Sequence, residues 1–212
     1  MQNTNGANTA GRSARKANVR SLVMAALMGV LSFILMYFNF PVPILSPFAE
    51  LDASALPEII GGFILGPACA LEIIIVKIAL ILIFKGSSSF FTGEVQNFLL
   101  SVSYVLPAIL YYRKHRTKKG AAIGLVIGSA ASVVVAVFTN LYIIFPAYIY
   151  LIGMTWDDII GIFHEVNPYI TNLPTIAAFS VVPFNLVSRA ATSLITMLLY
   201  KKISVPIKKF IS

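Results

Sequence analysis

Long apolar segments separated by short polar ones run through this chain. The first, residues 21–38, is close to the roughly 20 residues that a membrane-spanning helix needs, and it ends at the sequence FPVP, where the residue before each proline is pushed out of helical geometry. The apolar residues 55–84 would form a helix of about 45 Å, which is longer than a hydrocarbon core of about 30 Å. Because Gly66 and Pro67 break that run, we expect a short helix over 55–65, which cannot cross the core alone, and a longer helix over 67–84.

The second half of the chain predicts three further membrane helices. One covers residues 94–112, one starts at residue 121 and is broken at Pro146, and the last covers 175–200 after a more polar loop that extends to Pro174. The sequence therefore predicts an all-α integral membrane protein with six transmembrane helices within residues 19–212. Residues 1–18 are polar and basic, and we expect them to form a disordered cytoplasmic tail.

Composition supports the membrane assignment. Of 212 residues, 58% are hydrophobic and 11% are charged, which leaves too little polar surface to cover a soluble domain of this size. The formal net charge of +8 comes mainly from three clusters that abut apolar segments, as the positive-inside rule expects of cytoplasmic loops. We favour this explanation over nucleic-acid binding because no aromatic residues alternate with the basic ones. The clusters are Arg12, Arg15, Lys16 and Arg20; Arg113, Lys114, Arg116, Lys118 and Lys119; and Lys201, Lys202, Lys208 and Lys209.

The positions of these clusters test the number of crossings. With six crossings, all three clusters and both termini lie in the cytoplasm, whereas five or seven would place one cluster on the wrong face. The outside loops then contain mostly acidic residues, with Lys85 as the only basic residue there. The acidic residues are Glu50, Asp52, Asp157, Asp158 and Glu165.

Motifs for catalysis are missing from the sequence. It contains no phosphate-binding loop of the G-x-x-x-x-G-K-[ST] type and no His-Glu-x-x-His or paired-cysteine motif, so we expect no ATP hydrolysis, no metal site and no enzyme activity in this chain. No Ser, nor the single Cys69, has an identifiable base for nucleophilic chemistry. The pair Gly128-Ser129 lacks the surrounding G-x-S-x-G pattern and favours close helix packing.

Four ionisable residues, Glu58, Glu72, Lys77 and Arg189, fall inside the apolar segments and are therefore candidates for function. Lys77 lies near the middle of its helix, where it can pair with Glu72 or Glu58 or meet an anionic ligand. Arg189, in the last helix, either extends to the cytoplasmic headgroups or takes part in a site.

Two asparagines and a stripe of small residues also have two interpretations each. Asn140 and Asn185 lie in the outer halves of their helices, so they either converge on one outward-facing cavity or form interhelical hydrogen bonds. Ser21, Ala25 and Gly29 repeat every four residues on the first helix. Such a stripe allows close approach of another backbone, either within the chain or from a partner subunit.

Four segments taken in order resemble the vitamin-binding S components of energy-coupling factor (ECF) transporters, most closely the riboflavin-specific ones. They are FPVPILSPFAELDASALPEIIGGFILGP, GEVQNFL, TNLYIIFPAY and VVPFNLVSRAATSLITMLLYKKIS, and the similarity extends over about residues 25–204. The resemblance implies a multi-pass protein of the bacterial cell membrane with six helices and both termini in the cytoplasm. It also implies a subunit that captures a water-soluble vitamin outside. A transmembrane coupling protein and two ATPase subunits would then drive release of the vitamin inside.

The resemblance also implies which residues contact the vitamin. Asn140 and Asn185 match the asparagines that bind riboflavin in the family, whereas Ser188 stands where many members have a lysine. Further ligand-binding candidates are Lys77, Gln96, Asn97, Tyr104 and Tyr142. The outer loop with Pro41, Pro43, Pro47 and Phe48 is expected to cover the ligand, and Ser21, Ala25 and Gly29 to contact the coupling protein. The vitamin is the transported ligand, and we expect no cofactor.

The identity of the vitamin depends on the chemistry of the site. Riboflavin is neutral and wide and needs apolar or aromatic walls and amide hydrogen bonds, which favours it here. Pantothenate is a carboxylate and would need a positive partner such as Lys77 or Arg189. An alternative of another class is a stand-alone ion-coupled carrier in which Glu58, Glu72 and Lys77 form an ion relay, although the sequence shows no internal repeat.

Overall fold

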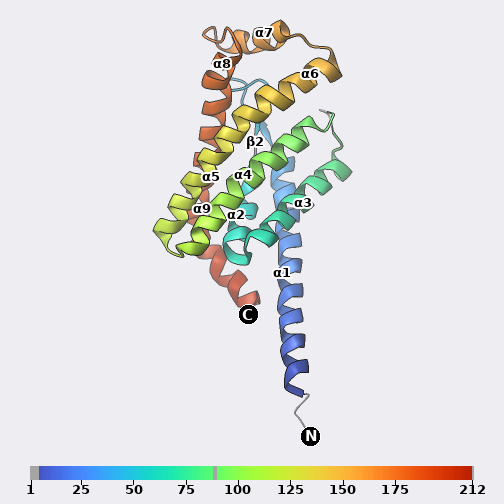
Figure 1. Ribbon diagram of the computed structural model, residues 1–212, viewed down its shortest axis with the longest axis vertical. Helices are drawn as coiled ribbons and strands as arrows, with labels where there is room; N and C mark the ends of the chain where they lie inside the picture. Colours follow the sequence, from blue (N-terminus) through green and yellow to red (C-terminus); the bar gives the residue numbers. More distant parts are fainter. Residues whose placement is uncertain (1–4, 88–89, 212) are drawn as a thin grey trace.

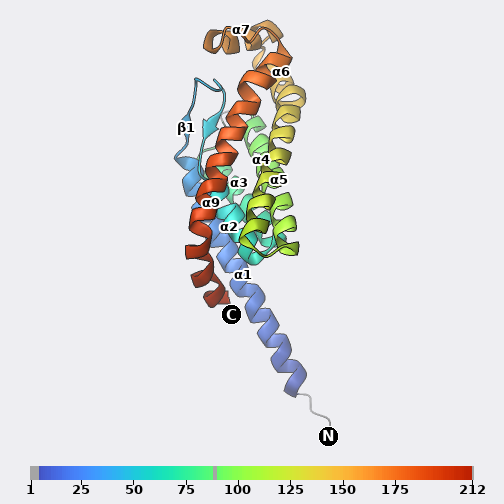
Figure 2. The ribbon, with the colours of Figure 1, turned by 90° about the vertical axis from the view of Figure 1, so that its left-hand side faces the viewer.

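Long helices run back and forth along one axis in the computed structural model, which describes residues 5–87 and 90–211 (Figure 1). Both ends of the chain and the α4–α5 connection lie towards one end, and α7 lies across the other (Figures 1 and 2). The elements are α1 (Asn5–Tyr37), β1 (Phe40–Pro41), β2 (Glu50–Leu51), α2 (Ala55–Leu65), α3 (Pro67–Phe84), α4 (Thr92–Lys114), α5 (Lys118–Thr139), the π-helix η1 (Asn140–Ile144), α6 (Phe145–Ile152), α7 (Trp156–Val166), α8 (Leu173–Ile176), the π-helix η2 (Ala177–Val181) and α9 (Val182–Ile211).

The helices have the lengths and composition of a multi-pass membrane protein. Within the described residues, five helical stretches are long and apolar enough to cross a membrane, namely 19–37, 67–84, 92–114, 118–152 and 173–199. The helix α2 is apolar but shorter. The described chain is thus mostly helical, as predicted, with one small exception: Phe40 pairs with Leu51 and Pro41 with Glu50 in a short antiparallel hairpin.

The short helix α2 is enclosed by the rest of the protein. Its residues from Ala55 to Phe63 are all buried, and it contacts α1, α3, α4 and α9. A helix too short to cross the hydrocarbon core is tolerated there because protein, rather than lipid, surrounds its ends. Both α2 and α3 begin and end at the residues that the Gly66-Pro67 break predicted.

Close packing joins α4 to α5. A Cβ atom on Gly128 would collide with the backbone oxygen of Tyr104, and one on Gly124 would lie 2.6 Å from that of Ala108. These glycines therefore let the two backbones approach, because any larger side chain would force them apart. This confirms the packing role expected of Gly128.

Three boundaries differ from the sequence-based expectation. The helix α1 continues back to Asn5, whereas we expected a disordered tail over residues 1–18; residues 1–4 lie outside the described part. Extension of an existing helix needs no new nucleus. Pro146 does not break its helix, because the π turn η1 precedes it and the span continues to Ile152. The last helical stretch begins at Leu173 and extends to Ile211.

The polar loop expected before Pro174 contains a helix, α7. Thr155 is its N-cap: the Thr155 side chain accepts a hydrogen bond from the Asp158 backbone N–H, and Asp158 Oδ2 accepts from the Thr155 backbone N–H at 2.8 Å. This reciprocal arrangement satisfies two backbone donors at the start of the helix. The hydrogen bonds from Thr155 also hold the pKa of the Asp158 carboxyl below its usual value.

Candidate functional site

A cavity of about 340 Å³ lies at the end of the molecule that carries the hairpin and α7. Its walls come from α1, α3, α4, η1, α6, α7, η2 and α9 and from the loop between α1 and α2. Its volume is within the range of small-molecule sites, which begins near 300 Å³. The polar side chains that line it are Asn39, Ser46, Glu50, Asp52, Lys85, Glu94, Gln96, Asn97, Asn140 and Asn185, and the aromatic ones are Phe48, Phe145, Tyr148, Phe163 and Phe184.

Asn140 is placed by the π turn η1. In this turn the N–H of Phe145 bonds to the Asn140 carbonyl, five residues back, instead of four. Pro146, which follows, has no N–H and cannot continue a regular α-helical ladder, so the wider turn lets the helix pass through the proline. Turns of this kind are frequent at functional sites because they redirect side chains. Here the turn starts at the asparagine that lines the cavity.

Asn185 also follows a π turn and a proline on its own helical stretch. The π turn η2 ends at Val181, and Pro183 follows two residues before the asparagine. Asn185 Nδ2 donates to the Val181 carbonyl at 2.9 Å, and Asn140 Nδ2 donates to the Ala136 carbonyl at 2.7 Å. Each amide therefore uses one N–H on its own helix, which leaves its oxygen and its second N–H for a ligand.

The predicted convergence of Asn140 and Asn185 on one cavity is confirmed. Within the described part of the chain, neither side chain bonds to another helix. The alternative interpretation, interhelical hydrogen bonds, is therefore wrong. The two asparagines come from separate helical stretches, and each stretch contains a π turn that ends two residues before a proline.

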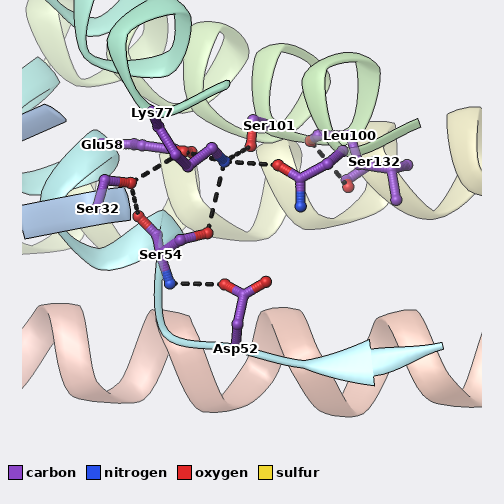
Figure 3. A network of polar contacts seen from close by, with 9 residues as sticks. Ser32, Asp52, Ser54, Glu58, Lys77, Leu100, Ser101 and Ser132 are labelled. Atoms are coloured by element: carbon purple, nitrogen blue, oxygen red, sulfur yellow. Dashed lines mark hydrogen bonds and ion pairs between the residues drawn. The ribbon is translucent and has the colours of Figure 1, made fainter. Parts of the chain in front are cut away.

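Beneath the cavity, Lys77 forms an ion pair with Glu58 (Figure 3). Both side chains are 0% exposed. The Lys77 ammonium also donates to Ser101 Oγ at 3.0 Å and lies 3.4 Å from Ser54 Oγ. Buried charges are stable only when paired and hydrogen-bonded, so this network explains how a lysine is accommodated at membrane depth. Of the two predicted partners, the structure selects Glu58 and not Glu72.

Asn97 connects this network to the cavity. Lys77 Nζ donates to Asn97 Oδ1 at 2.6 Å, and Asn97 itself lines the cavity. Lys77 is not among the residues that line the cavity, so it lies one side chain behind the wall. The network also reaches the outer loop, because the Ser54 backbone N–H donates to Asp52 Oδ1 at 2.7 Å and Asp52 lines the cavity (Figure 3).

The loop between α1 and α2, residues 38–54 and called the outer loop, lines one side of the cavity. Ser180 Oγ donates to the Leu45 carbonyl at 2.6 Å, which fastens the loop to η2. Phe48 contacts two rings, Tyr148 with centroids 5.4 Å apart and Phe163 with centroids 5.5 Å apart. The predicted cover residue Phe48 thus lines the cavity, whereas Pro41, Pro43 and Pro47 lie in the same loop without lining it.

Several predicted ligand contacts lie elsewhere. Tyr142 is 71% exposed and stacks on Phe138 on the outer face of its helix. Tyr104 is buried, and its hydroxyl lies 3.0 Å from Ser193 Oγ. Ser188 is half-buried and does not line the cavity. Tyr142 faces away from the cavity, whereas Tyr104 and Ser188 lie further along their helices, beyond the cavity residues Leu100 and Asn185.

Arg189 is buried and does not reach the headgroups. It is 8% exposed, its Nε donates to Ser132 Oγ at 3.0 Å, and its guanidinium carbon lies 4.9 Å from the centre of the Tyr104 ring. The expected snorkelling is wrong because neighbouring helices supply a hydroxyl and an aromatic face, which attracts a cation. Arg189 does not line the cavity either.

The small-residue stripe on α1 serves internal packing. Ala25 is 0% exposed, and a Cβ atom on Gly29 would lie 2.6 Å from Val76 Cγ1 of α3. Ser21 is half-buried. Of the two interpretations, close approach within the chain is the one that these contacts support, and Ala25 and Gly29 are not free to face a coupling protein.

Sequence reasoning missed the aromatic part of the cavity. Phe163 comes from α7, a helix that we had assigned to a loop, although the spacing of Thr155 and Asp158 is a recognisable capping signal. Phe184 is next to the predicted site residue Asn185 at the cavity wall, and Tyr148 lies eight residues beyond the predicted Asn140. Phe184 in particular could have been found because it directly precedes Asn185.

Comparisons with known proteins agree with this architecture. A family model described as "ECF transporter, substrate-specific component" matches residues 20–200. The riboflavin transporter RibU of Staphylococcus aureus (strain TCH60) is 26% identical over 193 residues, which is 90% of this chain and 95% of that protein. The riboflavin transporter FmnP of Bacillus subtilis (strain 168) is 28% identical over 186 residues, 87% of this chain and 92% of that protein.

A solved structure has the same fold. It is described as "Structure and mechanism of the S component of a bacterial ECF transporter" and superposes with a TM-score of 0.69 at 24% sequence identity. The superposition covers 90% of this chain and 99% of the other.

Proposed function

This chain belongs to the family of substrate-specific components of ECF transporters, and on that premise we propose that it binds riboflavin in the cavity under the outer loop. The family places the protein in a membrane and in transport rather than in enzyme catalysis. Riboflavin is the ligand that the names of the curated relatives carry.

The chemistry of the cavity supports riboflavin most directly. Five amide side chains line the cavity, among them Asn97, Asn140 and Asn185, and its other walls include Phe48, Tyr148 and Phe184. A flavin ring system is flat, aromatic and uncharged, and its edge carries both hydrogen-bond donors and acceptors. Apolar walls with a few placed amides are the environment that such a ligand needs. This combination of amides and aromatic rings is the observation that carries the proposal.

The charges around the cavity argue against pantothenate. Among the described residues that line it, Glu50, Asp52 and Glu94 are acidic and Lys85 is basic. The two buried cations that we considered for an anionic ligand are engaged elsewhere, Lys77 by Glu58 and Arg189 by Ser132 and Tyr104. A carboxylate would therefore enter a site with an excess of negative charge, and an anion in a low-dielectric pocket needs a positive partner.

The positions of the basic clusters and of the cavity at the two ends of the molecule suggest how the chain is oriented in the membrane. The basic clusters at residues 113–119 and near both chain ends lie towards one end, and the cavity lies towards the other (Figure 1). By the positive-inside rule, the proposal places the basic end in the cytoplasm and the cavity outside. The five long helical stretches and α2 then make six crossings.

The proposal assigns release of the vitamin to other subunits. In this proposal, a transmembrane coupling protein binds this chain. Two ATPase subunits hydrolyse ATP so that the bound chain topples in the membrane and releases the vitamin inside. The family description as one component of a transporter supports this division of labour.

Two measurements test the proposed function. The protein purified from cells is expected to carry a visible flavin absorption band, and a colourless preparation that takes up no added riboflavin would contradict the choice of vitamin. In liposomes, the chain alone should bind riboflavin without accumulating it. Accumulation driven by a proton gradient, without ATPase subunits, would instead establish the ion-coupled carrier.

A further inference from the structure

Lys77 and Glu58 lie behind the cavity wall, where a ligand in the cavity does not contact them. Any role that they have in ligand binding is therefore indirect. Both are 0% exposed, and neither lines the cavity. Yet the four acceptors around the Lys77 ammonium include one, Asn97 Oδ1, that belongs to a cavity residue. We propose that Lys77, held by Glu58, is a positioning residue that fixes the Asn97 amide so that the cavity presents an N–H donor to the ligand at this point.

The chemistry of the ammonium group determines which way the amide points. A lysine ammonium carries three donors and no acceptor, and the Glu58 carboxylate forms an ion pair with it. The Asn97 atom that lies 2.6 Å from Nζ must therefore be the oxygen. The opposite assignment would place two donors against each other.

The amide nitrogen of Asn97 is left for the cavity. Within the described residues, Asn97 makes one hydrogen bond, which its Oδ1 accepts from Lys77. Its Nδ2 is not one of the buried atoms without a partner, so it is accessible from the cavity that Asn97 lines. A donor in this position recognises an acceptor on the ligand, either a carbonyl oxygen or an unprotonated ring nitrogen. Asn140 and Asn185 each donate one N–H to a carbonyl of their own helix. Unlike Asn97, they keep their amide oxygen, together with the second N–H, for the ligand.

The other contacts of Lys77 prevent the amide from turning. Ser101 Oγ accepts from Nζ at 3.0 Å, Ser54 Oγ lies at 3.4 Å, and Glu58 Oε1 also lies 3.3 Å from Ser32 Oγ. The ammonium of Lys77, which α3 carries, is thus held by groups from α2, α4 and the end of the outer loop (Figure 3). Without this anchor, the Asn97 side chain could rotate and offer either its oxygen or its nitrogen, and discrimination between acceptor and donor ligands would fall.

The inference rests on the proposed function, since riboflavin and its analogues are the probes. The purified full-length chain is titrated with riboflavin and with a panel of four analogues. Two replace one ring-nitrogen acceptor with C–H, and two replace one carbonyl oxygen with sulfur, a weaker acceptor. For the unmodified chain, at least one analogue should bind about tenfold more weakly than riboflavin, the value of one hydrogen bond left unmade.

Two variants test the role of Lys77. Glu58→Gln/Lys77→Met removes the charge pair as a unit, so no unpaired charge is buried, and Asn97→Asp keeps the oxygen beside Lys77 but cannot donate. In both, the ratio of affinities between riboflavin and the discriminating analogue should fall to within about threefold. A loss of protein stability would weaken the binding of both ligands equally, so it would leave this ratio unchanged. Thr196→Val, at a buried hydroxyl without a partner in the described chain, is the matched control and should keep the full ratio.

The outcomes separate the two claims. If the unmodified chain discriminates against no analogue, or if either variant keeps its ratio, the positioning role of Lys77 is overturned and riboflavin binding still stands. If the unmodified chain binds no riboflavin at all, the proposed function fails, and this inference fails with it. Should the double variant not fold, Asn97→Asp decides alone.

Discussion

Phe48 of the outer loop lies edge-on against Phe163 of α7, with ring centroids 5.5 Å apart. The contact joins two segments that are more than a hundred residues apart in the chain, and both rings line the cavity. The loop and α7 together therefore close the cavity, and the strength of their contact should set how quickly a ligand escapes.

Phe48→Ala should accelerate ligand dissociation. The substitution removes edge-to-face contacts with Phe163 and Tyr148, each worth about 0.5–1.5 kcal/mol, so the dissociation rate should rise about five- to 150-fold. Stopped-flow measurement of flavin fluorescence gives this rate. Ile44→Ala is the matched control, because Ile44 lies in the same loop but is 83% exposed. Equal dissociation rates for Phe48→Ala and the unmodified chain would show that the loop does not retain the ligand.

Removal of the Asn185 amide should weaken binding. Asn185→Ala deletes a cavity group that is 5% exposed, and the ligand atom it contacts would be left unsatisfied at a cost of about 1–3 kcal/mol. Calorimetric titration should therefore show an affinity lower by about five- to 150-fold, with a similar loss for Asn140→Ala.

Tyr142→Phe provides the comparison for both asparagines, since Tyr142 is two residues from Asn140 but faces outwards. Its affinity should match that of the unmodified chain. If the tyrosine variant weakens binding as much as the asparagine variants do, the cavity is not the binding site.

Breaking the buried ion pair on one side should cost more than removing it whole. Lys77→Met leaves the Glu58 carboxylate buried without its cation, which typically costs about 3–5 kcal/mol, whereas replacing both partners is often neutral. Thermal unfolding in detergent should show a lower midpoint for Lys77→Met than for Glu58→Gln/Lys77→Met. The opposite order would mean that the pair carries no mutual stabilisation.

Enlarging Gly29 should destabilise the fold. A Leu at this position would push into Val76 of α3, and overpacking of this kind costs about 1–3 kcal/mol. Gly29→Ala should lower the unfolding midpoint as well, and the added substitution Val76→Ala should restore part of the loss by making room. A stable Gly29→Leu protein that binds riboflavin but fails in transport would instead show that Gly29 faces a partner subunit.

Local signals in the sequence predicted part of this architecture. The Gly66-Pro67 break predicted to the residue where α2 ends and α3 begins. A proline at the first helical position and a glycine before it act on the backbone directly. The convergence of Asn140 and Asn185 followed from their depth along their helices.

Other features depended on contacts that a sequence does not display. Glu72 looked as good a partner for Lys77 as Glu58 did, yet residues five apart on one helix do not face each other, and only the position of α2 brings Glu58 into reach. Arg189 is retained by Ser132 and Tyr104 from two other helices. The orientation of the stripe at Ala25 and Gly29 depends on how α1 rotates against α3. By contrast, α7 was missed although its Thr155 and Asp158 capping pair is local.

Titration of the purified full-length chain with riboflavin, with pantothenate as the competitor, tests the central claim most directly. The account predicts saturable binding of one riboflavin per chain that pantothenate in large excess does not displace, because the cavity offers amides and aromatic rings and has more acidic than basic groups around it. Absence of riboflavin binding, or its displacement by pantothenate at comparable concentrations, would contradict the account.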